Sequence, residues 1–227
     1  MGELRTRMIN AMQLRQFSPR TQQSYLAAVV GLAKHYHQLP DQLSSEKIQA
    51  YLLHLTVERG LSWSSCNVTV SGLRFFYQQT LGWDGLRLPI PPRQRPSKLP
   101  EILSHQELER LFAAAHLPKH RVLLMTTYAA GLRLSEVIAL KLTDLDSQRQ
   151  MIRVEQGKGR KDRYTILSPK LLEELRLYWK MCRPISYLFP GRDPNRPMDS
   201  SAAQKIYYAA KERAGIQKGM GIHTLRH

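Results

Sequence analysis

A proline-rich stretch in the middle of the chain limits the fold more than any other feature. It reads LRLPIPPRQRPSKLP, from Leu86 to Pro100, with five prolines, four basic residues and no acidic residue. Proline fixes its own φ angle and lacks an N–H donor, so such a run forms neither a helix nor an inner strand. We therefore expect a linker at residues 86–100 between two folded domains, residues 1–85 and 101–227. The linker either lets two basic domains wrap a partner or is an ordinary solvated connector.

The chain is strongly positive. It holds 34 Lys and Arg against 18 Asp and Glu, a formal net charge of +16 at pH 7. Such an excess favours a nucleic-acid partner, with the ribosome and an anionic membrane surface as the other candidates. The longest apolar run, Leu26 to Ala33, is too short to span a bilayer, and the N-terminus lacks the apolar core of a signal peptide. We expect a soluble intracellular protein.

The usual signatures of metal and nucleotide chemistry are missing from the sequence. The two cysteines, Cys66 and Cys182, lie far apart, which predicts neither a disulfide framework nor a zinc site. There is no GxxxxGK[ST] loop, no HExxH motif and no paired acidic cluster. We expect a protein that needs no bound metal, no ATP and no other small-molecule cofactor.

The first domain has the pattern of four helices. A short basic helix is expected near residues 3–15. The next helix begins at a Ser18 cap followed by Pro19, and the third follows a serine cap in SSEKIQAYLLHLTVERG. The last helix is expected from about residue 64, with β-branched residues along it and an interruption at Gly72.

The second domain has the pattern of helices around a small sheet. Ser104 and Glu107 form a capping box, and the apolar stretch HRVLLMTTYAAGLRLSEVIAL predicts helices at the centre of a core. The segment DSQRQMIRVEQGKGRKDRYTILSP alternates as short strands around a Gly-Lys-Gly turn, which predicts a β-hairpin. Two helices follow. The fold class is therefore mainly α, with one small antiparallel sheet of three strands.

Three separated fragments hold residues that suit phosphate chemistry. Arg133 and Glu136 in GLRLSEVIAL are three residues apart, Lys158 stands between two glycines in QGKGRKDR, and His223 and Arg226 share a face in GIHTLRH. Together these basic groups would bind a phosphodiester and stabilise charge on its oxygens. Each fragment alone also has an ordinary explanation, as a local ion pair, a solvated turn or a surface histidine.

The three fragments, in this order, resemble the conserved boxes of the tyrosine recombinases, the phage integrase family. The match is carried by YAAGLRLSEVIALKLTDLD, VEQGKGRKDRYTILSP and HTLRH, and is nearest to the bacterial chromosome-dimer-resolving and integron-like branches. The segment SPRTQQSYLAAVVGLAKHY is similar to the SAM-like core-binding domain of the same family. The resemblance implies a four-helix DNA-binding domain and a mainly helical catalytic domain.

The resemblance also implies roles for individual residues. Arg133 and Arg226 would hold the non-bridging oxygens of the scissile phosphate, and Lys158 would protonate the leaving 5′ oxygen. His223 would assist proton movement at the same phosphate. Glu136 stands at a supporting acidic position. One further supporting residue is expected from the family pattern: His227.

The family's attacking tyrosine lies several helical turns after the HxxR box, and this sequence has no tyrosine there. Tyr207 and Tyr208, on the helix before that box, are interpreted as ordinary aromatic residues of the core. No nucleophile is assigned, so the chain is expected to be truncated, to bind DNA and to lack strand cleavage. A non-catalytic DNA-binding protein is the alternative, and a basic protein that binds RNA or the ribosome is a third hypothesis.

The expected partner is double-stranded DNA, held between the two domains. The intact family member would act as a homotetramer on paired DNA sites, in the cytoplasm near the nucleoid of a bacterium. The resemblance and the positive charge suggest five residues as DNA contacts, two on helices of the first domain and three in the linker: Arg20, Arg74, Arg93, Arg95 and Lys98.

Overall fold

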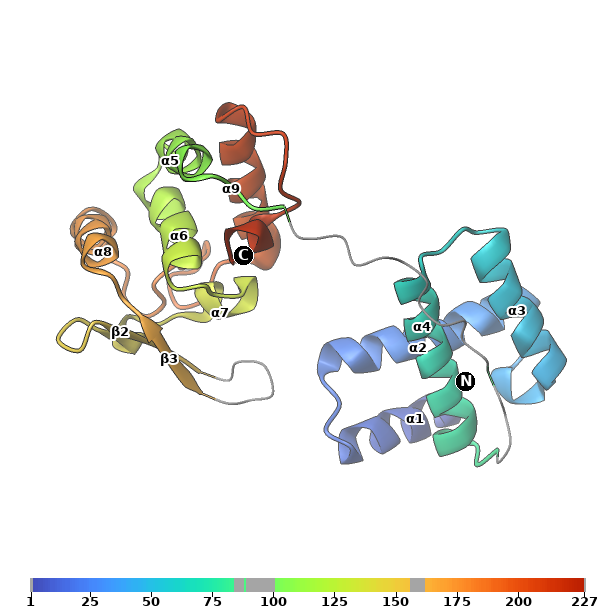
Figure 1. Cartoon of the computed structure of the whole chain (residues 1–227). Helices are drawn as coiled ribbons and strands as arrows, with labels where there is room; N and C mark the ends of the chain where they lie inside the picture. The colour runs from blue at the N-terminus through green and yellow to red at the C-terminus, as the bar shows by residue number, and fades with distance from the viewer. Residues whose placement is uncertain (1, 84–87, 89–100, 156–161, 227) are drawn as a thin grey trace. The chain divides into compact units, whose positions relative to one another are not determined.

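The computed structural model describes residues 2–83, 88, 101–155 and 162–226 of the 227-residue chain. Its contacts divide the chain into two compact units, residues 1–96 and 97–227 (Figure 1). Each unit is described by itself.

The first unit is a bundle of helices. Its α-helices are α1 (Gly2–Leu14), α2 (Pro19–Tyr36), α3 (Ser45–Val57) and α4 (Trp63–Arg74), with a short 3-10 helix, η1 (Pro40–Gln42), between α2 and α3. The side chains of Ser18, Ser44 and Ser62 each accept a backbone N–H in the first turn of the helix that follows. These caps satisfy donors that have no partner inside the helix, which is why the helices begin where they do.

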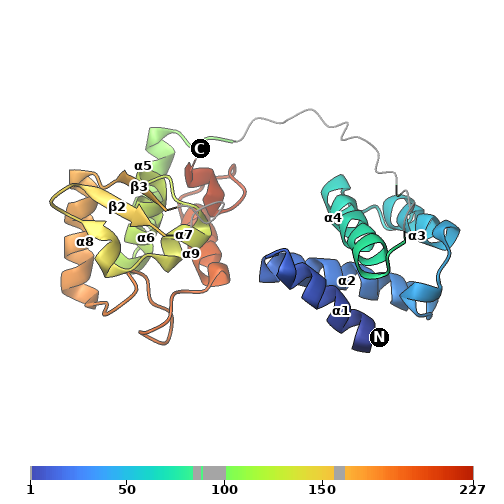
Figure 2. The same cartoon turned by 90° about the horizontal axis from the view of Figure 1, so that it is seen from below.

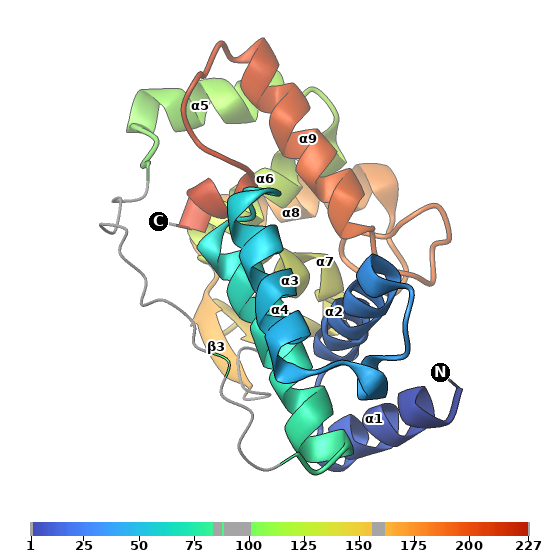
Figure 3. The ribbon, with the colours of Figure 1, turned by 90° about the vertical axis from the view of Figure 1, so that its right-hand side faces the viewer.

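Helix α4 does not stop at Gly72, so the predicted interruption was wrong. The helix continues to Arg74 and then as a π-helix, η2 (Phe75–Thr80). A Cβ atom at Gly72 would lie 3.0 Å from the Cα atom of Tyr25 and 3.1 Å from the Cβ atom of Ala28. Gly72 therefore serves the close approach of α4 to α2 rather than ending a helix. Figure 3 shows α3 alongside α4 in the same bundle.

The second unit is built around helix α6 (Pro118–Ala129), in which six consecutive residues from Val122 to Thr127 are buried. Figures 1 and 2 both show α6 between α8 (Pro169–Cys182) and α9 (Ser200–Arg213), and it contacts both helices. The remaining helical elements are α5 (His105–Ala114), α7 (Leu134–Ala139) and two 3-10 helices, η3 (Leu142–Asp144) and η4 (Ile222–Arg226).

Helix α5 begins at the predicted capping box. The hydroxyl of Ser104 accepts the N–H of Glu107, and the carboxylate of Glu107 accepts the N–H of Ser104. The prediction from the spacing of these two residues is confirmed.

A small antiparallel sheet completes the second unit. In the described part of the chain its strands are β1 (Leu145–Asp146), β2 (Met151–Val154) and β3 (Arg163–Ile166), in the order β1-β2-β3. The register pairs Met151 with Ile166 and Val154 with Arg163. The predicted fold class, mainly α with a small three-stranded antiparallel sheet, is confirmed.

Candidate active site

Arg133 stands at the start of α7, directly after the turn that ends α6. Gly131 in that turn has a φ of +59°, in the left-handed region that favours glycine. Leu132, Leu134 and Val137 around the arginine belong to the hydrophobic core. Because these neighbours are buried, α7 is fixed, while the side chain of Arg133 remains 31% exposed. An arginine held in this way can meet a ligand without first being ordered.

Glu136 is the buried acidic group of this region, with its side chain 5% exposed. Its carboxylate accepts the backbone N–H of Arg133 at 2.8 Å and a guanidinium N–H of the same residue at 2.7 Å. It also accepts two N–H groups of Arg163, each at 2.8 Å. These bonds, those from Arg163 first, outweigh burial and hold the pKa of Glu136 at about 2, below its ordinary 4.5.

Arg163 was not predicted from the sequence. It lies 27 residues from Glu136 and donates two hydrogen bonds to the carboxylate of that residue. The alternation of polar and apolar residues along β3 does not reveal it, because such a pattern alone predicts that the apolar residues face inward. In the structure Arg163 and Thr165 are half-buried, while Tyr164 and Ile166 are exposed. A charged side chain on the inner face of a strand needs a partner of opposite charge, and here that partner is Glu136.

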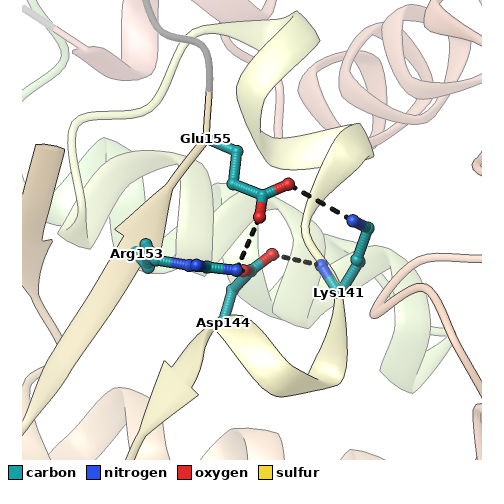
Figure 4. A network of polar contacts seen from close by, with 4 residues as sticks. All are labelled: Lys141, Asp144, Arg153 and Glu155. Carbon is teal, nitrogen blue, oxygen red and sulfur yellow. Dashed lines mark hydrogen bonds and ion pairs between the residues drawn. The ribbon is translucent and has the colours of Figure 1, made fainter. Parts of the chain in front are cut away.

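A second network ties the other side of the hairpin to the segment after α7 (Figure 4). Arg153 on β2 donates to the carboxylates of Asp144 at 3.2 Å and Glu155 at 2.5 Å. Lys141 donates its ammonium to Glu155 at 3.2 Å and its backbone N–H to Asp144 at 2.8 Å. Ion pairs therefore attach Glu155, just before residues 156–161, and Arg163, soon after them, to the rest of the unit. Sequence reasoning missed this network.

Lys158, predicted for the tip of the hairpin, lies outside the described residues, and so does His227. The structure therefore describes only their neighbours in the sequence, not these two residues themselves.

His223 and Arg226 lie in the 3-10 helix η4. Ile222, Thr224 and Leu225 of this helix are buried, whereas His223 and Arg226 are exposed. In a 3-10 helix residues three apart lie on the same face, so the two basic side chains project together. The predicted shared face is formed by a 3-10 turn rather than by an α-helix.

The loop before η4 is held by three side chains. Glu101 accepts the N–H of Gly219 at 2.6 Å, and Lys211 donates to the carbonyl of the same glycine at 3.0 Å. The side-chain carbonyl of Gln204 accepts the N–H of Ile222 at 3.1 Å. These bonds fix the backbone immediately before His223.

Arg133 and the pair His223 and Arg226 belong to elements with common neighbours. Both α7 and η4 pack against α6 and α9. The two short helices contribute apolar residues to the same core, among them Val137 and Leu225. The core therefore anchors both basic segments to the same pair of long helices.

Tyr207 and Tyr208 differ in their surroundings. Tyr207 is fully buried in the hydrophobic core, and its burial raises the pKa of its hydroxyl. Tyr208 is 50% exposed on the same helix. The buried ring of Tyr207 contributes to packing, which agrees with its interpretation as an aromatic residue of the core. The same interpretation of Tyr208 was wrong, because its ring lies on the exposed face of α9.

The candidate DNA contacts are described only in part. Arg20 is exposed in the first turn of α2, and Arg74 is an exposed residue whose guanidinium donates to the carbonyl of Leu88 at 3.0 Å. The other three candidates, in the linker, lie outside the described residues: Arg93, Arg95 and Lys98.

The described residues form neither a metal cluster nor a membrane-spanning helix. Among them, no group of three or more His, Cys, Asp or Glu residues could hold a metal ion. In the same part of the chain, no helix is both long and apolar enough to cross a membrane.

Comparison with protein families gives two matches along the chain. A model of the phage integrase family matches residues 101–227, and one of the phage integrase N-terminal SAM-like domain matches residues 4–84.

Among curated relatives, an integrase/recombinase of Sinorhizobium fredii is 45% identical over 230 residues, covering 100% of this chain and 74% of the relative. The tyrosine recombinase XerA of Thermococcus kodakarensis is 31% identical over 216 residues, covering 92% of this chain and 73% of the relative.

Solved structures give matches to the whole fold. The crystal structure of XerA recombinase is 28% identical with a TM-score of 0.52, covering 99% of this chain and 81% of that chain. A lambda integrase tetramer bound to a Holliday junction is 16% identical with a TM-score of 0.75, covering 99% and 70% respectively. The second match is a likeness of fold alone.

Proposed function

Since the chain belongs to the phage integrase family of tyrosine recombinases, we propose that it binds duplex DNA and takes part in site-specific strand exchange through a 3′-phosphotyrosyl intermediate. One observation carries this proposal. Arg133 and the pair His223 and Arg226 project from two short helices, α7 and η4, that pack against the same two long helices, α6 and α9. Basic groups fixed by a common core form a preorganised site for a phosphodiester.

In this site Arg133 and Arg226 bind the non-bridging oxygens of the scissile phosphate. Guanidinium groups suit this role because their N–H donors match the geometry of a phosphate and stay charged at every working pH. His223 donates to the same phosphate and assists proton movement. Charge that develops on the oxygens then meets donors that are already in place.

The proposed reaction conserves the energy of the broken bond. A tyrosine hydroxyl attacks phosphorus and gives up its proton with the assistance of His223, a 3′-phosphotyrosyl bond forms, and the bond from phosphorus to the 5′ oxygen breaks. Lys158 gives its proton to the leaving 5′ oxygen, so a 5′ hydroxyl is released. Attack by a 5′ hydroxyl from another strand reverses these steps, and the reaction needs no nucleotide.

Two residues have supporting roles in this proposal. Glu136 holds Arg133 in place through the contacts described above. His227 follows Arg226 directly in the sequence and supports it.

DNA binding is proposed to spread over both units and the linker. The positive net charge of +16 supports this, and the candidate contacts to the phosphates are Arg20, Arg74, Arg93, Arg95 and Lys98. The lambda integrase structure named above is a tetramer on a Holliday junction. We infer a corresponding homotetramer on paired DNA sites for the intact recombinase.

No tyrosine of this chain is assigned as the nucleophile. We propose that none of the tyrosines among these 227 residues is the nucleophile, so that these residues by themselves bind DNA without cutting it. The test uses a duplex that the chain itself selects from a random library, with nicks introduced to trap intermediates. A denaturing gel then reports a covalent protein-DNA adduct.

The expected result is an adduct only when the chain is extended with the part of the Sinorhizobium fredii relative that lies beyond the matched residues. Tyr207→Phe in the extended chain should leave the adduct unchanged. An adduct formed by the 227-residue chain would contradict the assignment. Absence of any adduct from the extended chain, with DNA binding intact, would favour a protein that occupies sites without cutting.

A further inference from the structure

The two arginines at Glu136 bind it in different ways. Arg163 donates from Nη1 to Oε1 and from Nη2 to Oε2, both at 2.8 Å, so it binds the carboxylate in a bidentate manner through two parallel hydrogen bonds. Arg133 gives one guanidinium N–H at 2.7 Å and its backbone N–H at 2.8 Å. Paired parallel bonds are the stronger arrangement for an arginine and a carboxylate.

The charges of this group do not cancel. One carboxylate faces two guanidinium groups, which leaves a net charge of +1. If Glu136 faced Arg133 alone, the pair would be neutral, and an incoming phosphate would be attracted far less.

Strand β3 is attached to the segment that carries Arg133 at two points. Besides the contact of Arg163 with Glu136, the hydroxyl of Thr165 donates to the carbonyl of Ala130 at 3.0 Å. Both residues face inward on the strand. The position of Arg163 relative to α7 is therefore fixed by the sheet as well as by the ion pair.

We propose that Arg163 is a positioning residue of the recombination site. Arg163 neutralises the charge of Glu136, so the positive charge of Arg133 remains available to attract the phosphate. It also fixes the position of Glu136 relative to the start of α7. This inference rests on the proposed function, because it takes Arg133 to be a phosphate ligand. Arg163 itself acts through Glu136 and Arg133.

The test measures the affinity of the 227-residue chain for inorganic phosphate. The ring signals of His223 in an NMR titration report local binding, and His223→Asn identifies them among the eight histidines. Arg163→Met, which keeps most of the side-chain length and removes the charge, should weaken phosphate binding about tenfold. The double variant Glu136→Gln with Arg163→Met should return to within about twofold of the parent, because it removes both charges.

The recovery of affinity in the double variant distinguishes a role of Arg163 in neutralising Glu136 from a purely structural role. Were Arg163 only a structural support, the double variant would bind phosphate as weakly as Arg163→Met, and that result would overturn the proposal. Parent affinity in a folded Arg163→Met chain would overturn it as well. If Arg163→Met does not fold, the double variant and Arg163→Lys, which keeps the charge, should both stay within about twofold of the parent. A large loss in both would refute the proposal.

A matched control is available on the neighbouring strand. Arg153 pairs with the buried carboxylate of Asp144, which is 4% exposed, just as Arg163 pairs with Glu136. Arg153→Met should leave phosphate affinity at His223 unchanged, and a loss equal to that of Arg163→Met would contradict the specific role of Arg163.

Two further variants separate this inference from the proposed function. Arg133→Ala and Arg226→Ala should both weaken phosphate binding. If neither does, the proposed function fails. If both do while a folded Arg163→Met chain binds normally, only the inference on Arg163 fails.

Discussion

Replacing Glu136 by glutamine should destabilise the second unit in a pH-dependent way. The carboxylate is buried and accepts four N–H groups from two arginines. These contacts, led by the bonds from Arg163, hold the pKa of Glu136 at about 2 instead of 4.5. Because the folded protein binds this proton more weakly than the unfolded chain, the stabilisation is complete above pH 4.5 and is lost as the pH falls toward 2.

The size of the effect follows from the shift in pKa. At about 1.4 kcal/mol per pH unit, a fall from 4.5 to about 2 corresponds to about 3 kcal/mol of folding free energy at pH 7. At pH 3 the same linkage leaves about 1 kcal/mol. The difference in stability between the parent and Glu136→Gln should therefore shrink by about 2 kcal/mol between pH 7 and pH 3.

Urea unfolding followed by tryptophan fluorescence can measure this difference. The chain has three tryptophans, so Trp63→Phe and Trp83→Phe leave Trp179 on α8 as the reporter of the second unit. Glu109→Gln is the control, because Glu109 is exposed and pairs only loosely with His105 at 3.3 Å; it should change stability by less than about 0.5 kcal/mol. An equal loss in Glu136→Gln at both pH values would refute the reasoning.

Two other predictions concern close contacts of glycines. Gly72→Ala should destabilise the first unit by about 1–3 kcal/mol in the same kind of unfolding experiment, because the new Cβ atom would lie 3.0 Å from the Cα atom of Tyr25; an unchanged midpoint would contradict this packing. Glu101→Ala should speed amide hydrogen exchange at Gly219 by about tenfold or more, since it removes a charged acceptor, while Glu101→Gln keeps an acceptor and should change the rate much less. Equal rates in all three proteins would show that this bond does not hold the loop.

The parts of the fold that depend on neighbouring residues could be predicted from the sequence. The caps at Ser18, Ser44 and Ser104 involve residues at most three positions apart, so local patterns revealed them. Gly72 was misjudged because its role depends on Tyr25 and α2, which a local pattern does not contain. A glycine that breaks a helix and one that lets two helices approach look alike in sequence.

The residues of the candidate site also differ in whether the sequence alone could indicate them. Arg133, His223 and Arg226 could be named because they lie in recognisable short motifs. Arg163 could not, because its contact with Glu136 forms only when β3 lies against α7, and no local rule joins positions 27 residues apart. Partners across a fold are set by tertiary packing, which periodicity and capping rules do not describe.

The central claim is that Arg133 and Arg226 hold the scissile phosphate. Its most direct test is the affinity for the selected duplex when that phosphate is replaced by a neutral methylphosphonate, at the position mapped with the extended chain. The parent should lose about tenfold in affinity, the effect of about 1.4 kcal/mol for a charged contact. Arg226→Ala should lose clearly less than tenfold between the two duplexes, because one of the two arginine contacts to this phosphate is already gone, and the double variant Arg133→Ala with Arg226→Ala should bind both duplexes about equally. If Arg226→Ala still loses tenfold on the methylphosphonate duplex, or if the parent loses nothing, the site does not hold this phosphate.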